Sequence, residues 1–149
     1  MEVLDTVRDV LAQKGTAVWS VTPDVTVFDA IALMAEHNIG AVLVMESERL
    51  VGLLSERDYT RKVILKGKLS KDTLVRDIMS TEVTIVGPLD TVEHCMRLMT
   101  LKRMRHLPVV ENDRVIGVVS IGNLVNWIIS VQGAALDQME RYIGSEYPG

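Results

Sequence analysis

Apolar and polar positions follow patterns whose period changes along the chain. Between residues 27 and 34 the apolar positions have the spacing i, i+3, i+4, i+7, which predicts a helix with one buried face. These positions are Val27, Ala30, Ile31 and Met34. Residues 41–45 and 50–54 are apolar runs joined by a polar stretch, which predicts a β-hairpin. A short apolar strand at 18–21 comes first and a second helix starts at Ser55, so the order is β-α-β-β-α.

The same order of elements occurs again 65 residues further along the chain, without a gap. The second copy has a short strand at 83–86, a helix at 92–99, apolar runs at 106–110 and 115–119, and a helix that starts at Ser120. Many pairs of residues are identical at this offset. They include Pro23 and Pro88, Thr26 and Thr91, Leu33 and Leu98, Gly52 and Gly117, and Ser55 and Ser120. This register indicates the duplication of one structural unit.

A short motif ahead of each copy is duplicated as well. Residues 7–11, Val-Arg-Asp-Val-Leu, recur at 75–79 as Val-Arg-Asp-Ile-Met with an offset of 68, so the first copy carries three additional residues, which we place near 14–16. We expect the first motif to lie in a helix at residues 2–13 that packs onto the pair of repeats.

These patterns predict an α+β fold in which two β-α-β-β-α repeats form a pseudo-two-fold pair. One such unit is too small to bury its apolar face alone. We therefore expect the two units to pack sheet against sheet around one core, with two similar clefts along the junction. The predicted segments are an N-terminal helix (1–14), a first repeat (15–66), a connector (67–74), a second repeat (75–142) and a C-terminal tail (143–149).

Composition argues against several classes of protein. The net charge of −4 over 149 residues disfavours a general nucleic-acid-binding surface. The single cysteine, Cys95, cannot form an internal disulfide, which predicts a reducing cytoplasm. No basic segment followed by an apolar run opens the chain, so no signal peptide is expected. Residues 115–136 carry no charge, but polar residues interrupt them and the repeat divides them into a strand and a helix, so we expect no membrane span.

Five motifs, taken in order and in two registered copies, resemble the CBS (cystathionine-β-synthase-type) repeat family. They are Val-Arg-Asp-Ile-Met (75–79), Asn-Ile-Gly-Ala-Val-Leu-Val (38–44), Val-Gly-Leu-Leu-Ser-Glu-Arg-Asp (51–58), Arg-His-Leu-Pro-Val-Val (105–110) and Ile-Gly-Val-Val-Ser-Ile-Gly-Asn (116–123). The resemblance spans residues 7–127. It implies a stand-alone CBS pair, usually a homodimer, that senses AMP, ADP, ATP or NAD in preference to S-adenosylmethionine and regulates a partner protein that the sequence does not name.

The tetrapeptide Ser55-Glu56-Arg57-Asp58 follows an apolar strand and opens a helix. A helix N-terminus presents free N–H groups that suit phosphate, and Ser55 and Arg57 add a hydroxyl and a charge. Asp58 offers two acceptor oxygens, and the resemblance implies that they bind ribose hydroxyls. From the motif alone, the alternative is a plain helix capping box.

The second copy has Ser120, Gly122 and Asn123 at the matching positions. Because Asn lacks the charge and the second acceptor oxygen of Asp, we expect weaker ribose binding there. The resemblance implies that each cleft combines residues of both repeats. Ser55, Arg57 and Asp58 are expected to share a cleft with Thr81, Val83, Met104 and His106, and Ser120, Gly122 and Asn123 to share one with Thr16, Ile39, Gly40 and Ala41. Lys14 and Pro108 complete the predicted nucleotide-binding residues.

Residues 102–106, Lys-Arg-Met-Arg-His, form the densest positive run. The resemblance implies phosphate contacts from Arg105 and His106, and the fork of donors on Arg suits phosphate. A solvated turn is the alternative for Lys102 and Arg103, and a cap on strand backbone groups is the alternative for His106.

Other candidate residues favour structural roles. Cys95 is expected in the core, with a reactive thiol as the alternative. Trp19 is also expected in the core, with contact to a base as the alternative, and Trp127, Ile128 and Ile129 form a candidate dimer face. The histidines lack the spacing of a metal site, and no phosphate loop or nucleophile–base pair is evident, so we expect neither metal nor catalysis. The main hypothesis is a nucleotide sensor, and a protein-interaction scaffold with degenerate clefts is the alternative.

Overall fold

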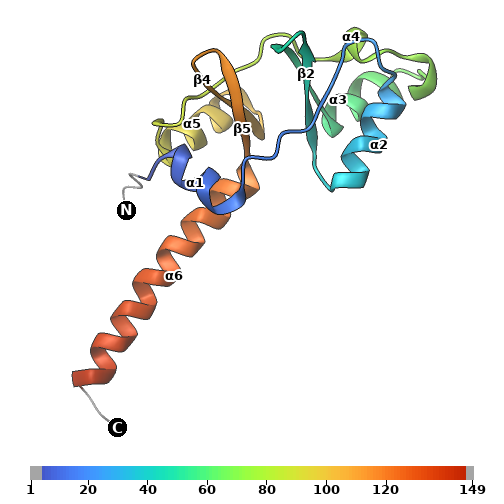
Figure 1. Ribbon diagram of the computed structural model, residues 1–149. Helices are drawn as coiled ribbons and strands as arrows, with labels where there is room; N and C mark the ends of the chain where they lie inside the picture. Colours follow the sequence, from blue (N-terminus) through green and yellow to red (C-terminus); the bar gives the residue numbers. More distant parts are fainter. Residues whose placement is uncertain (1–4, 147–149) are drawn as a thin grey trace.

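The computed structural model describes residues 5–146, without the side chains of residues 135, 136 and 142–146. It is an α+β fold in which two similar halves stand side by side (Figure 1). In chain order the elements are α1 (Val7–Lys14), β1 (Ser20–Val21), α2 (Val27–His37), β2 (Ala41–Glu46), β3 (Arg49–Ser55), α3 (Glu56–Tyr59), the π-helix η1 (Thr60–Ile64), the 3₁₀-helix η2 (Ser70–Asp72), α4 (Val75–Ile78), α5 (Val92–Lys102), β4 (His106–Glu111), β5 (Arg114–Ser120) and α6 (Ile121–Glu146). The predicted fold class is confirmed, and so is the duplicated order of elements, apart from the strand predicted at residues 83–86.

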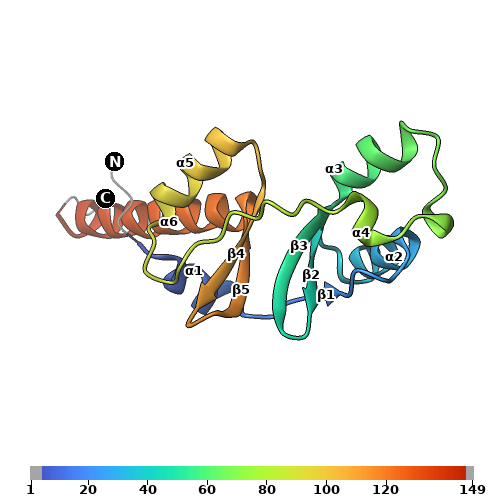
Figure 2. The same cartoon turned by 90° about the horizontal axis from the view of Figure 1, so that it is seen from above.

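Each half is organised around an antiparallel hairpin, β2–β3 in the first repeat and β4–β5 in the second, and the two hairpins stand face to face in Figure 2. Each hairpin turns at two residues with positive φ, which are Ser47 and Glu48 in the first and Asn112 and Asp113 in the second. Such two-residue turns match the twist of the strands that they join. The predicted hairpins are therefore present in both repeats.

The short strand ahead of each hairpin forms in only one repeat. β1 pairs in parallel with β2, and the Leu43 N–H donates to the Trp19 carbonyl at 3.1 Å. In the second repeat, residues 83–86 were predicted as a strand, but they join β4 through a single parallel bridge at Val86. The position that matches Leu43 is Pro108, which has no N–H to donate to the ladder. The proline therefore explains why this strand is missing.

The helix ahead of each repeat packs on the opposite repeat. The Val7 N–H at the start of α1 donates to the Asp90 carbonyl at 2.9 Å, and the Val75 N–H at the start of α4 donates to the Val25 carbonyl at 2.9 Å. In Figure 1 the chain leaves α1 beside β5 and crosses to the other half before it enters α2. The exchanged helices supply the apolar surface that each unit lacks.

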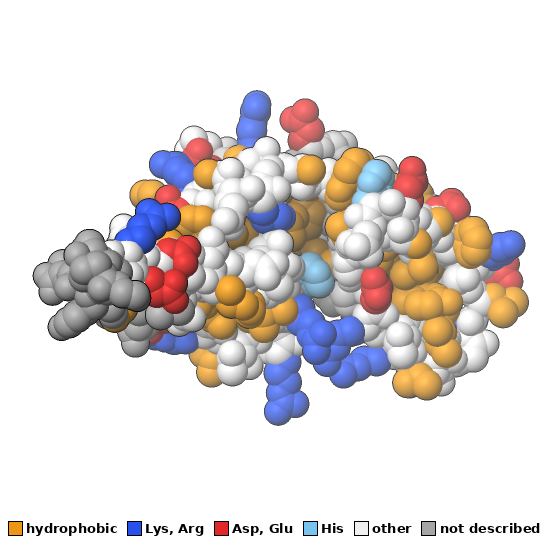
Figure 3. All heavy atoms as spheres, turned by 90° about the horizontal axis from the view of Figure 1, so that it is seen from below, with side chains coloured by type: hydrophobic (Ala, Val, Ile, Leu, Met, Phe, Trp, Pro, Cys, Tyr) orange, Lys and Arg blue, Asp and Glu red, His pale blue; other side chains and the backbone are white. Residues whose placement is uncertain are grey.

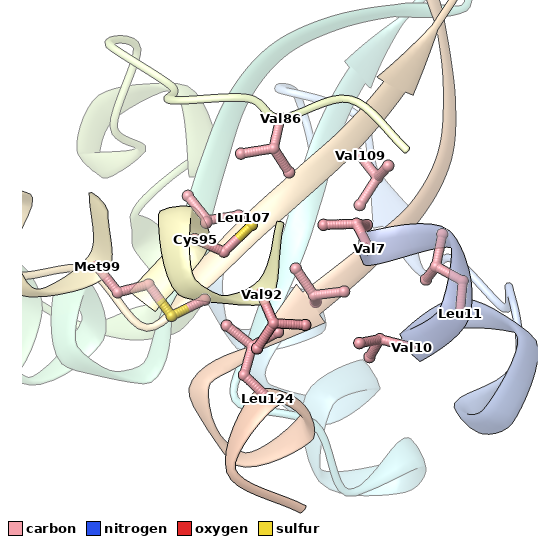
Figure 4. Close-up of a cluster of buried hydrophobic side chains, with 11 residues drawn as sticks. Val7, Val10, Leu11, Val86, Val92, Cys95, Met99, Leu107, Val109 and Leu124 are labelled. Carbon is pink, nitrogen blue, oxygen red and sulfur yellow. The ribbon is translucent and has the colours of Figure 1, made fainter. Parts of the chain in front are cut away.

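Each repeat has a hydrophobic core of its own. In the second repeat Val7, Val10 and Leu11 of α1 point into a cluster with side chains of α5, β4, β5 and α6 (Figure 4). In the first repeat Val75 and Ile78 of α4 join side chains of α2, β2, β3 and η1. The prediction of one shared core is wrong, because the exchanged helices cover the apolar face of each repeat separately.

The final helices of the two repeats differ in length. α3 has four residues and continues as a π-helix to Ile64, whereas α6 runs for 26 residues and projects from the body (Figure 1). α6 thus passes residue 142, where the second repeat was predicted to end, because no proline interrupts the chain before Pro148. Residues 2–4 of the predicted N-terminal helix and 147–149 of the predicted tail lie outside the described residues. In the described part of the chain, no helix is long and apolar enough to span a bilayer.

The apolar side chains at the start of α6 differ in how far they are buried. Trp127 and Ile128 pack against the core of the second repeat, and the Trp127 indole N–H donates to Asp5 Oδ2 at 3.0 Å. Ile129 is 60% exposed. Trp127 and Ile128 are only partly buried in this contact, so the dimer face at these three residues stays a prediction.

Candidate functional site

Two clefts lie at the junction of the repeats, with volumes of about 320 Å³ for cleft 1 and about 250 Å³ for cleft 2. Cleft 1 brings together the predicted residues Ser55, Arg57, Asp58, Val83, Met104, Arg105 and His106. Cleft 2 brings together the predicted residues Lys14, Ile39, Gly40, Ala41, Ser120 and Asn123. Each cleft has walls from both repeats, as the pseudo-two-fold pairing requires.

Four predicted residues are not among those that line either cleft. Thr81 and Thr16 lie in extended segments where side chains alternate between two sides, and their neighbours Glu82 and Ala17 line the clefts instead. Gly122 has no side chain to present, and Pro108 is buried within β4.

The Asp58 carboxylate lies at one corner of cleft 1, where β3 ends and α3 begins. Its Oδ2 accepts hydrogen bonds from the Ser55 N–H (2.9 Å) and hydroxyl (3.0 Å), while the Asp58 N–H donates to Ser55 Oγ (3.2 Å). Its Oδ1 pairs with Lys62 Nζ at 3.2 Å. The motif is therefore a true capping box, and its carboxylate also lines the cleft.

Cations from both repeats gather around the same cleft. They are Arg57, Arg61, Lys102, Arg103 and Arg105, set against the acids Glu56, Asp58 and Glu82. Seen from below, Lys and Arg side chains cluster at one edge of the junction between the repeats (Figure 3). Arg61 and Glu82 were not predicted to line a cleft. Arg61 lies three residues after Asp58, on the same helical face, so helical spacing was a usable signal for it.

His106 stands between the two clefts and lines both of them. Its ring atoms Cε1 and Nε2 lie 3.4 Å from the point where a Cβ on Gly40 would be. Gly40 therefore leaves room for the imidazole. Burial, and then the nearby charges of Arg105 and Lys14, lower the pKa of His106 below its ordinary value.

Cleft 2 repeats the corner of cleft 1 without its charge. Asn123 Oδ1 accepts from the Ser120 N–H at 2.9 Å, and the Asn123 N–H donates to Ser120 Oγ at 3.1 Å. Lys14 Nζ donates to the Val118 carbonyl at 2.5 Å, and burial lowers its pKa.

Trp19 also lines cleft 2 and is 39% exposed. Its ring stacks on that of His37, with centroids 3.5 Å apart and planes inclined by 13°. The prediction of a core position for Trp19 is wrong, because this residue directly precedes the edge strand β1 and its side chain lines the cleft at the junction.

Cys95 lies in the second core and is fully buried, as predicted. Burial, and then the charge of Asp90, raise the pKa of its thiol to about 11, so the reactive thiolate is strongly disfavoured. Among the described residues, no three His, Cys, Asp or Glu side chains are grouped so as to hold a metal ion.

Comparison with known proteins matches the CBS domain model to residues 6–64 and 75–130. The chain belongs to the CBS domain family. The CBS pair is 40% identical to the CBS domain-containing protein CBSX3 of Arabidopsis thaliana, which is named mitochondrial, over 95% of this chain and 73% of that protein. It is 33% identical to the CBS domain-containing protein YhcV of Bacillus subtilis, over 81% of this chain and 84% of that one.

Solved structures agree with this assignment. A protein with CBS domains from Burkholderia ambifaria MC40-6 is 45% identical, and its structure superposes with a TM-score of 0.83 over 85% of this chain and 95% of that one. The CBS domain structure NE2398 is 49% identical, with a TM-score of 0.81 over 84% of this chain and 98% of that one. The alignments cover the two solved chains almost completely, so the CBS pair described above is the unit that these proteins share.

Proposed function

We propose that this CBS pair is a regulatory module that binds an adenine nucleotide in cleft 1 and that it catalyses no reaction. One observation carries the proposal: the Asp58 carboxylate and five cations converge on one cleft whose walls come from both repeats. A nucleotide offers the complementary chemistry, because its ribose has hydroxyl donors and its phosphates are anionic. Val83 and Met104 provide apolar surface beside them for the base.

The hydrogen bonds of Asp58 suggest how a ribose is accommodated. An ionised carboxylate has about four acceptor sites, and the Ser55 N–H, the Ser55 hydroxyl and Lys62 use three of them. A ribose diol needs two. If the Ser55 hydroxyl rotates from Asp58 towards a phosphate oxygen, the second site becomes available while the Ser55 N–H keeps the cap in place. Ser55 then serves the helix and the ligand together.

A ligand held by both repeats favours the arrangement in which both walls reach it, and this differential affinity is the source of regulation. The proposed output acts on a partner protein through a homodimer of this chain.

Adenosine-containing ligands suit the fold: the CBS domain pair of MJ0100, which is 20% identical, forms a complex with 5′-methylthioadenosine and S-adenosyl-L-methionine. For localisation we propose a reducing compartment, because Cys95 is a free thiol.

Ligand titrations on the full chain test the proposal. ATP, ADP, AMP and NAD are each added in a thermal-shift and calorimetry panel, and a ligand at 100 times its dissociation constant is expected to add about 2.7 kcal/mol of stability. Asp58→Ala is expected to abolish the shift, whereas the matched variant Asn123→Ala retains most of it. Equal losses contradict the assignment to cleft 1, and no shift with any of the nucleotides supports the scaffold alternative.

A further inference from the structure

The two clefts are equivalent in position but differ in charge. At the offset of 65 residues that relates the repeats, six of the charged residues that line cleft 1 correspond to uncharged residues on the side of cleft 2. The pairs are Arg57 and Gly122, Asp58 and Asn123, Arg61 and Asn126, Glu82 and Ala17, Arg103 and Asn38, and Arg105 and Gly40. The charged side chains of cleft 1 in these pairs are mostly exposed, so packing of the core does not account for the difference between the two clefts.

We propose that cleft 2 discriminates against phosphate and selects a planar aromatic ligand of nucleoside type, with Trp19 as the residue that determines this specificity. The inference goes beyond nucleotide binding in cleft 1 and does not depend on it.

Trp19 supplies the surface for a flat ligand. It replaces Thr84 of cleft 1 at the same position of the repeat, lines cleft 2 and keeps 39% of its surface exposed. Its stack on His37 fixes the plane of the indole. A fixed, partly exposed indole favours stacking with an aromatic base, and such stacking tolerates different bases.

The polar groups of cleft 2 match an uncharged ligand. Asn123 Oδ1 is occupied by the Ser120 N–H, so the amide nitrogen remains to donate to a ligand acceptor. Lys14 is the single Lys or Arg among the described residues that line this cleft, and its Nζ is held by the Val118 carbonyl at 2.5 Å. A phosphate placed here loses its hydration without gaining the cations that surround cleft 1, which is unfavourable. The smaller volume, about 250 Å³ against 320 Å³, agrees with a smaller ligand.

Calorimetric titration of the full chain with adenosine and with AMP tests this selectivity. The Asp58→Ala variant is used as the background, so that cleft 1 does not contribute. Adenosine is expected to bind this variant at least tenfold more tightly than AMP. Adding Trp19→Ala is expected to weaken adenosine at least tenfold, and circular dichroism checks that the double variant is folded. Equal affinity for AMP and adenosine, or adenosine binding that is indifferent to Trp19, overturns the proposal.

A gain of function provides a second test. Asn38→Arg with Gly122→Arg, in the Asp58→Ala background, copies two cations of cleft 1 into cleft 2. Both positions accept Arg: Asn38 has φ 53° and its counterpart Arg103 has φ 52°, and a Cβ on Gly122 approaches no closer than 3.7 Å to Ser120 Oγ. AMP affinity is expected to rise at least tenfold, and no rise in a folded variant counts against the proposal.

The two proposals fail separately. If ATP does not bind the wild-type chain but adenosine binds the Asp58→Ala variant, cleft 1 loses its proposed function and cleft 2 keeps its own. If ATP binds the wild-type chain and adenosine does not bind the Asp58→Ala variant, the phosphate-free site is refuted and the function of cleft 1 stands.

Discussion

Asn38 and Arg103 occupy the same position in the two repeats, directly after α2 and after α5. Both have left-handed backbone, with φ 53° and φ 52°. Asn tolerates this conformation better than other residues with a Cβ, because its short side chain bonds locally. Arg103 has no such advantage, and it lines cleft 1. Strain at this position is consistent with a cation that is kept for ligand binding at some expense of stability.

The variant Arg103→Asn therefore tests whether stability and ligand affinity are opposed at this position. We expect the free energy of unfolding to rise by up to about 1 kcal/mol, because Asn relieves the left-handed strain. The affinity for ATP is expected to fall, because cleft 1 loses a cation. Urea unfolding and ATP calorimetry measure the two effects. The reverse change Asn38→Arg is the matched control and is expected to lower stability by a similar amount.

His106 makes stability depend on pH. Because its pKa is lowered in the folded protein, the unfolded chain takes up the proton first as the pH falls through the ordinary histidine value of about 6.5. The contribution of His106 is thus fully present above that value and is lost towards the lower folded pKa. We expect wild-type stability to fall between pH 7.5 and pH 5.5.

The variant His106→Ala copies Ala41, the matching residue of the first repeat. It is expected to show a smaller loss between the same two pH values in urea unfolding, even if its stability is lower at both. An unchanged difference between pH 7.5 and pH 5.5 rules out His106 as the group responsible.

Individual residues differed in how well the sequence predicted their place. The positions of Asp58 and Arg105 in cleft 1 were predictable, because the resemblance to the CBS family located the motifs that carry them. Trp19 was not, because an apolar residue beside a short strand has no sequence signal that distinguishes an edge position from the core. Arg61 and Glu82 were not predicted, because both lie outside the five motifs, next to them along a helix and an extended segment.

At the level of elements, two glycines let the exchanged helices dock. A Cβ on Gly52 would come within 2.7 Å of the Met79 sulfur and 3.0 Å of the Ser80 carbonyl oxygen, and a Cβ on Gly117 would come within 2.8 Å of a Leu11 methyl group. These positions are equivalent in the two repeats, and each faces the exchanged segment. Their missing side chains are thus part of the packing between hairpin and helix.

Alanine at these two glycines is expected to destabilise the protein unequally. Gly52→Ala meets a backbone oxygen that cannot rotate away, so we expect a loss near the upper end of the usual overpacking range of about 1–3 kcal/mol. Gly117→Ala meets only the end of a flexible leucine side chain and is expected to cost less. Urea unfolding of both variants decides the order, and a larger loss for Gly117→Ala contradicts this account.

The elements themselves were largely predictable, because both hairpins and the paired helices α2 and α5 have clear periodicity. The exchange of α1 and α4 was not, since a helix pattern shows which face is buried but not which repeat buries it. The missing strand at 83–86 had a signal in Pro108, whose consequence appears only once its position across from that strand is known.

At the level of the whole molecule, each core contains a helix contributed from across the junction. Unfolding of either repeat therefore also removes the helix that it contributes to the core of the other repeat. The two repeats are thus expected to unfold together. The two repeats have separate cores and not the single core that was predicted, but the exchanged helices α1 and α4 link the two cores.

Val7→Ala and Val75→Ala form a matched pair for testing this coupling, because both side chains are fully buried at equivalent positions. Each is expected to lower the free energy of unfolding by about 2 kcal/mol. Calorimetry is expected to show one transition, which both variants shift to lower temperature. Two separate transitions, each sensitive to only one variant, contradict the coupling.

The crossing of α1 and α4 also has a consequence for the separated repeats. A single repeat whose leading helix packs elsewhere leaves an apolar face uncovered, and a second repeat covers that face with its own leading helix. The connector between the repeats makes this exchange intramolecular. Severed within residues 67–69, the present chain yields two pieces that each carry the other's missing helix, and mixing them should rebuild the native pair.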